Sequence, residues 1–128
     1  MSWYQFCETL EVYRLAFDAS MQILDATRNF PSEGTMMISE NIRRSSRMVC
    51  HHISEAMRQK ASQTLFLHHL ANAKMEAEDT MKWIKQAVAK EYVNIESGAR
   101  LYSSYHSVVA KLIGLLTHPA PHVLEKAA

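Results

Sequence analysis

The sequence predicts an all-α protein, an antiparallel up-down-up-down four-helix bundle. Three observations lead to this fold class. Glycine and proline together number only six in 128 residues, too few for the many tight turns of a β-sandwich. Apolar residues recur at steps of three and four in four separate segments, which is the period of an α-helix. The connections between these segments are short, and short connections place successive helices antiparallel.

The first helix is expected over about residues 5–29. Ser2 and Gln5 have the spacing of a capping box, and Pro31 ends the helix because a residue before proline avoids helical dihedrals. Two apolar stripes run side by side, as in a helix with two neighbours, and we expect both in the core. The more regular stripe comprises Leu10, Tyr13, Phe17, Met21 and Leu24, and the adjacent one comprises Val12, Ala16, Ala19 and Ile23.

The other three helices are expected over about residues 34–58, 62–91 and 95–117. Small Ser45 and Ser46 at the middle of the second would let a neighbour approach closely. Ser62 is the expected N-cap of the third helix and Asn94 that of the fourth. Two prolines follow Thr117 and end the last helix. We therefore expect one domain over residues 1–118 and a tail over residues 119–128.

Charge is unevenly distributed along the chain. Residues 1–34 carry two basic and five acidic side chains, a net charge of −3, whereas residues 35–60 carry five basic and two acidic ones, a net of +3. Opposite surfaces on one protomer favour self-association or pairing between helices. The total of only +1 predicts no strong field for nucleic acid by itself, although the basic segment is a local patch that phosphates could meet.

The two cysteines, Cys7 and Cys50, are far apart and lack the spacing of a redox or zinc motif. With no signal peptide in the sequence, we interpret them as free, buried thiols in a reducing cytosol. No apolar run approaches the ~20 residues of a membrane span. We expect a cytoplasmic protein with no membrane partner.

The segment from Phe30 to Ala56 resembles a family of four-helix-bundle proteins first noticed in intervening sequences of bacterial large-subunit ribosomal RNA genes. In ungapped order, the matching residues are Phe30-Pro31, Ile38, Asn41, Ile42-Arg43-Arg44-Ser45, Val49 and His52-Ile53-Ser54-Glu55-Ala56. Further similarity comes from Glu76, Asp79-Thr80, Trp83-Ile84 and Tyr92-Val93, so that the resemblance covers about residues 8–117. It implies a bacterial protein and a ring-shaped homopentamer, in a family whose cellular function is mostly unknown.

The chain departs from this family at four positions: Met48 replaces a serine, His52 an asparagine, and both Ala56 and Glu91 a glycine. Because residues other than glycine resist positive φ, the two helix-ending turns are unusual, and the second helix is free to continue past Ala56. One branch of the family serves as the accessory protein of diversity-generating retroelements. In that branch a basic ring surface binds RNA and a reverse transcriptase.

The candidate binding residues are the basic side chains of the second helix and its following turn. They are Arg43, Arg44, Arg47, Arg58 and Lys60. Five copies in a ring would sum to a surface that binds RNA or DNA phosphates. The alternative that we favour for the three central arginines is ion pairing with acidic residues of the first helix, such as Asp18 or Asp25, within or between subunits.

Two histidine pairs lie at similar heights on the second and third helices, and His52, His68 and His69 are weak candidates for metal ligands. Adjacent helical residues point about 100° apart, so at most one of each pair faces the other helix. The paired Glu-x-x-His motifs of a di-iron bundle are absent from the sequence. Ordinary surface or interface histidines are therefore the preferred interpretation, with no metal and no cofactor.

No serine or cysteine nucleophile has a recognisable base, and no glycine-rich phosphate loop is present in the sequence. We therefore expect no enzymatic activity and no catalytic residues. The first functional hypothesis is a non-enzymatic cytosolic scaffold that assembles into a homo-oligomer, implied to be a pentamer, and contacts a protein partner. The second is a nucleic-acid-binding accessory protein, a partner of a reverse transcriptase, that uses the basic patch.

Overall fold

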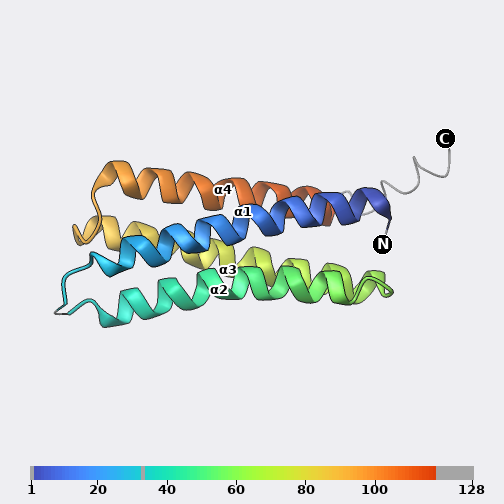
Figure 1. Cartoon of the computed structure of the whole chain (residues 1–128), viewed down its shortest axis with the longest axis horizontal. Helices are drawn as coiled ribbons and strands as arrows, with labels where there is room; N and C mark the ends of the chain where they lie inside the picture. Colours follow the sequence, from blue (N-terminus) through green and yellow to red (C-terminus); the bar gives the residue numbers. More distant parts are fainter. Residues whose placement is uncertain (1, 33, 118–128) are drawn as a thin grey trace.

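The computed structural model describes residues 2–32 and 34–117, so the expected tail at residues 119–128 lies outside the described residues. The helices are α1 (Trp3–Arg28), α2 (Met36–Arg58), α3 (Gln63–Ala89) and α4 (Ile95–Thr117), and the described ranges contain no strand. Figure 1 shows successive helices running in opposite directions along one long axis. The all-α four-helix bundle is therefore confirmed.

The four helices form a square in cross-section. α2 packs on α1 and α3, and α4 packs on the same two helices, while no backbone contact joins a diagonal pair within the described part of the chain. The α1/α2 face and the α3/α4 face therefore lie on opposite sides of the bundle. Within the same ranges, no helix has both the length and the apolar character of a membrane span.

The three N-terminal caps expected from the sequence are present. The Ser2 hydroxyl accepts the Gln5 amide at 3.0 Å and the Gln5 side chain accepts the Ser2 amide at 3.2 Å, so the capping box begins α1 at Trp3. Ser62 accepts the amide of Leu65 at 3.2 Å, and Asn94 accepts that of Ser97 at 2.8 Å. These bonds satisfy donors that the first helical turn leaves without partners.

One expectation about the core is wrong. The second α1 stripe is buried, from Val12 at 0% exposure to Ile23 at 0%, and it joins a core built from all four helices. The more regular stripe is not in the core: Phe17 is 47% and Met21 46% exposed, while Leu10, Tyr13 and Leu24 are half-buried at its edge. Ala16 and Ala19 explain the choice, because small side chains let neighbouring helices approach the buried side of α1 closely.

The two turns that lack the family's glycines differ from each other. α2 continues through Ala56 to Arg58, as the missing glycine predicted. After α3, Glu91 adopts φ 61°, the left-handed conformation that the absent glycine would have favoured. The Tyr92 amide donates to the Ala87 carbonyl and the Glu91 amide to the Val88 carbonyl, both at 2.9 Å, which is a complete Schellman motif.

Replacing Glu91 by glycine should raise the free energy of unfolding by about 1 kcal/mol, because the left-handed conformation costs an L-residue about this much. Urea denaturation followed by circular dichroism measures the change. Lys90→Gly is the control, since Lys90 has φ −90° and gains nothing from glycine. A Glu91→Gly variant that is less stable than the parent would contradict this reading of the turn.

Candidate functional site

The predicted basic residues do not form one cluster. Arg43 is half-buried between α1 and α2, where its Nε donates to Thr27 Oγ1 at 2.7 Å. Asp25 instead pairs with Arg28 at 3.1 Å. In residues 2–32 and 34–117 no carboxylate pairs with any of the three central arginines, so the favoured pairing within a subunit is wrong. Pairing between subunits stays a prediction.

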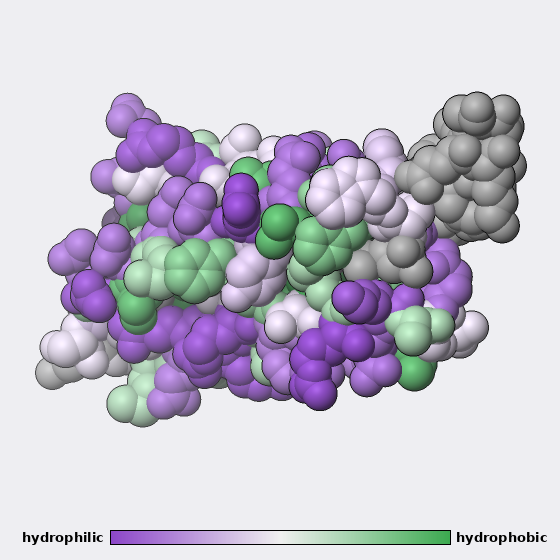
Figure 2. All heavy atoms as spheres, turned by 45° about the vertical axis from the view of Figure 1, so that its right-hand side comes forward, coloured by the Kyte–Doolittle hydropathy of each residue, from purple (hydrophilic) through white to green (hydrophobic). Residues whose placement is uncertain are grey.

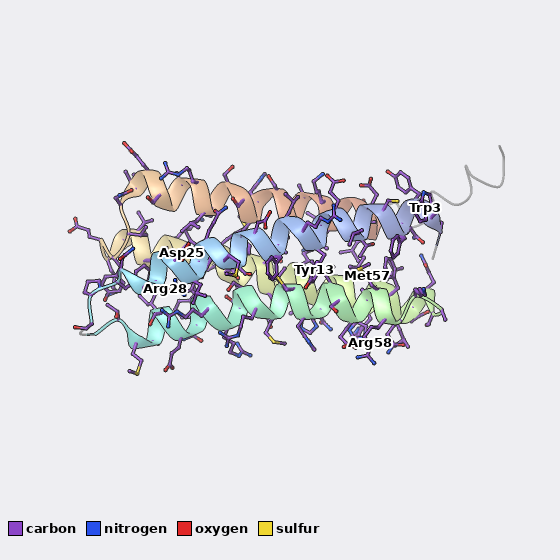
Figure 3. All side chains as sticks on the ribbon, in the orientation of Figure 1. Trp3, Tyr13, Asp25, Arg28, Met57 and Arg58 are labelled. Carbon is purple, nitrogen blue, oxygen red and sulfur yellow. The ribbon has the colours of Figure 1, made fainter. Side chains whose placement is uncertain are left out.

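The exposed basic side chains follow the outer side of α2. Arg44, Arg47, His51 and Arg58 are separated by three, four and seven residues, which places them along one stripe of about 21 Å. Arg58 pairs with Glu55 at 2.9 Å, and Figure 3 shows it on the side of α2 away from α1. Arg58 and the following turn residue Lys60 border a second hollow between α1 and α2. Arg43 thus lies between α1 and α2 and Arg44 on the outer stripe, whereas Arg47 and Arg58 belong to the stripe and also border hollows between α1 and α2.

The α1/α2 groove was not expected from the sequence. The displaced apolar stripe of α1 forms one wall, and α2 supplies Arg43 and Arg47 at the opposite edge, around a volume of about 310 Å³. Figure 2 shows hydrophobic residues gathered in a broken band across the visible face, with hydrophilic residues on either side. The regular apolar repeat of α1 and the arginine cluster of α2 were the sequence features that could have predicted this groove. From the sequence alone, however, a regular apolar repeat is expected in the core.

Two polar groups lie deep beside this groove. Cys50 is a half-buried free thiol that lines it, and burial raises its pKa. The Tyr105 hydroxyl of α4 is fully buried, and burial likewise raises its pKa, with Cys50 adding to the effect and Ser46 opposing it. Cys7, by contrast, is exposed, which corrects the expectation that both thiols are buried.

The histidines form a ladder across α2 and α3. The rings of His52 and His69 stack with centroids 6.5 Å apart, so one member of each pair faces the other helix, while His68 lies beside Asn72. Among the described residues, no three His, Cys, Asp or Glu side chains are grouped to hold a metal ion. Buried Nδ1 atoms of His52 and His69 have no hydrogen-bond partner within the described chain.

Burial lowers the pKa of His52, and the neighbouring histidines 51, 69 and 68 add to this effect while Glu55 opposes it. Because the folded pKa lies below the unfolded value, the unfolded chain binds the proton more readily as the pH falls through 6.5. Stability should therefore be complete above that pH and decline below it. Urea unfolding at pH 7.5 and 5.5 measures this loss, and His52→Asn should reduce it. An unchanged pH dependence in the variant would contradict the assignment.

A second and larger groove lies on the opposite face, between α3 and α4. Its volume is about 620 Å³, and its walls are almost entirely apolar. Lys85 lies at its edge with Nζ 5.3 Å from the centre of the Tyr102 ring, a cation–π contact. Ile95 at the start of α4 is 74% exposed beside it. The described bundle thus has apolar hollows on two opposite faces.

The fold agrees with a solved structure. The bundle is similar to a protein with unknown function from the S23 ribosomal protein family of Bacteroides thetaiotaomicron VPI-5482, with a TM-score of 0.79 and 22% sequence identity. The similarity covers 86% of this chain and 98% of that chain, and at this identity it shows the fold alone. Comparison with curated proteins gives no match.

The sequence itself supplies the family. The family described as 23S rRNA-intervening sequence protein matches residues 8–114, which include the Phe30–Ala56 segment and all or most of each of the four helices. Neither the name of this family nor that of the structurally similar protein refers to an enzymatic reaction. The resemblance seen in the arginine-containing segment is therefore confirmed: this chain belongs to the 23S rRNA-intervening sequence protein family.

Proposed function

We propose that the protein is a non-enzymatic cytosolic scaffold that assembles from identical copies, with the α3/α4 face covered by a neighbouring copy. The observation that carries this proposal is the composition of the outer side of α4. Positions at steps of three and four along this side carry no Asp, Glu, Lys or Arg over 19 residues, namely Ile95, Ala99, Tyr102, Ser103, His106, Ala110 and Ile113.

Two of the three charged residues of α4 have partners elsewhere, and the third, Glu96, lies in the first turn at the border of this side. Lys111 pairs with Glu11 of α1 at 3.1 Å, and Arg100 donates to Ser97 at 3.2 Å. An outer helix side without charge, next to an apolar groove of about 620 Å³, is typical of a surface that a partner covers. α4 carries only three charged residues, Glu96, Arg100 and Lys111, and none of them belongs to this side.

Five copies are what the resemblance implies for the assembly. In a ring, the α3/α4 face of one copy contacts a different face of the next copy. In a two-fold dimer, the α3/α4 faces of both copies would contact each other, so that α4 pairs with α4. The mass in solution distinguishes these arrangements, since one chain is 14.6 kDa. A protein partner would then bind the assembled particle.

Introducing glutamate at Ile95 and Ile113 should convert the assembly to monomers, because two charges would be placed in an apolar contact without counter-ions. Size-exclusion chromatography with light scattering measures the mass, and circular dichroism confirms that the helices remain. Met36→Glu with Met37→Glu is the matched control, since these side chains are 70% and 64% exposed on α2 and lie outside this face. A parent protein that is monomeric at micromolar concentration would overturn the proposal.

Binding of RNA or DNA is the second candidate function, and the outer stripe of α2 supports it. Arg44, Arg47 and Arg58 are exposed on one side of the helix, and Lys60 follows in the turn. A stripe of about 21 Å can follow a phosphate backbone, and repetition in a ring would multiply weak contacts. The pairing of Arg58 with Glu55 reduces the free charge and keeps this function second.

Fluorescence anisotropy with single-stranded RNA and duplex DNA over a range of salt concentrations tests this function. Phosphate contacts predict an affinity that falls steeply with salt, and a shallower slope in Arg44→Ala with Lys60→Ala. Lys82→Ala with Lys90→Ala is the matched control, since it removes two exposed positive charges away from α2. Salt-independent binding, or an unchanged slope in the double variant, would exclude this function for the stripe.

A further inference from the structure

The α1/α2 groove combines an apolar wall with two cations at one end. Tyr13, Phe17, Met21 and Leu24 line it from α1, while Arg43 and Arg47 line it from α2. Arg43 lies at the end nearest Leu24, because its Nε reaches Thr27, one turn further along α1. Arg47 follows one turn later on α2, so both guanidinium groups border the same part of the groove.

Neither guanidinium has a carboxylate partner in residues 2–32 and 34–117. The bond from Arg43 to Thr27 uses only one of the five donors of the side chain and fixes its orientation. A half-buried cation without a counter-ion is unfavourable, and an anion that accepts from both arginines would offset that cost. The charge of the groove therefore selects an anionic ligand.

The floor of the groove is polar but carries no opposing charge. Ser20, Ser46 and Cys50 line it, and the two serine hydroxyls already donate to the backbone carbonyls of Phe17 and Arg43. Behind Ser46 lies the fully buried hydroxyl of Tyr105. No carboxylate from the described residues lines the groove, so nothing in its walls repels an anion.

The shape of the groove selects a narrow ligand. From Tyr13 to Leu24 it follows α1 for ~16 Å, and a volume of about 310 Å³ over that length leaves room for the width of one extended chain. Tyr13 also borders the second hollow, of about 400 Å³, so the groove continues past Tyr13 toward Met57, with Arg58 and Lys60 at the edge of that hollow. Figure 3 shows Tyr13 and Met57 extending into the space between α1 and α2.

We propose that the α1/α2 groove binds a single-chain anionic amphiphile, a medium-chain fatty acid, with its carboxylate between Arg43 and Arg47. The hydrocarbon chain of the fatty acid runs along Phe17 toward Tyr13. The rings of these two residues stack with their centroids 6.3 Å apart. This function is separate from assembly through the α3/α4 face, which lies on the other side of the bundle. It would also give a role to the exposed apolar side chains of α1, Phe17 and Met21.

Isothermal titration of the assembled protein with decanoate, below its micelle concentration, tests the proposal. We expect one decanoate per chain and at least tenfold weaker binding of uncharged decanol, because only the anion satisfies the arginines. Arg47→Ala should weaken decanoate binding at least tenfold. Arg44→Ala is the matched control, since it removes the same charge from α2 outside the groove and should leave the affinity unchanged.

A groove-filling variant supplies a test that does not depend on charge. Cys50→Phe places a ring in the groove and should abolish decanoate binding, while thermal unfolding confirms that the variant is folded. Any of three results would overturn the proposal: no binding to the parent protein, equal affinity for decanol, or equal losses in Arg44→Ala and Arg47→Ala. Decanoate binding that persists in folded Cys50→Phe would place the site elsewhere and overturn it as well.

Discussion

Replacing Ile23 by alanine should lower the free energy of unfolding by about 2–5 kcal/mol, whereas Met21→Ala should change it by no more than about 0.5 kcal/mol. Ile23 is completely buried in the core, so its truncation removes apolar contacts and leaves a cavity. Met21 is 46% exposed at the edge of the α1/α2 groove, and its truncation leaves no internal cavity.

Urea denaturation of both variants, at matched protein concentration, measures the two changes. The comparison is informative because the residues lie two positions apart on one helix and belong to the two competing apolar stripes. If Met21→Ala were the more destabilising substitution, α1 would be rotated relative to the described bundle, and both the groove and the ligand proposed for it would be wrong.

The second large effect is expected at Gly98, where α4 packs tightly against Val88 near the end of α3. A β-carbon built at this position would overlap the Cγ2 methyl of Val88 and lie 3.8 Å from Cγ1 of Val93. Gly98→Ala should therefore destabilise the protein by about 1–3 kcal/mol, since overpacking forces a stiff, β-branched neighbour to move. Glycine is needed here for close approach and not for an unusual φ.

Gly114→Ala is the matched control on the same helix. Apart from its chain neighbours and the nearby backbone of α4, no atom of the described residues lies within 4 Å of a β-carbon built at Gly114, so alanine should stabilise the protein by about 0.5–1 kcal/mol through its better helix propensity. The two substitutions are chemically identical and are predicted to have opposite signs. Thermal unfolding of both distinguishes them, and a gain in stability from Gly98→Ala would show that α3 and α4 pack less tightly than described.

Local features of the chain were predictable because they depend on neighbours in sequence. The caps at Ser2, Ser62 and Asn94 need only a side-chain acceptor within three residues of a backbone donor. The continuation of α2 past Ala56 followed from the absence of a glycine at that position. The turn after α3 retained its geometry without glycine, because two backbone hydrogen bonds hold Glu91 at φ 61°.

The candidate site was only partly predictable. The sequence identified the basic residues of α2, but Arg43 could reach Asp25 or Thr27, two residues apart at the end of α1. The packed bundle brings Arg43 to Thr27, whereas Asp25 pairs with Arg28 in its own helix. Similarly, the histidine spacing predicted one facing pair, and only the helix rotation decides that this pair is His52 and His69.

The sequence by itself determined the fold class, the family and the helix caps, because apolar periodicity, motif order and capping are recorded along one chain. The tertiary structure decided which stripe of α1 is buried, which arginine lies in a groove, and that two apolar hollows lie on opposite faces. The physical reason is that the spacing of apolar residues shows that a helix has an apolar side, but it does not determine how the helix is rotated about its axis in the bundle. Rotation is set by how closely small residues such as Ala16 and Gly98 let neighbouring helices approach.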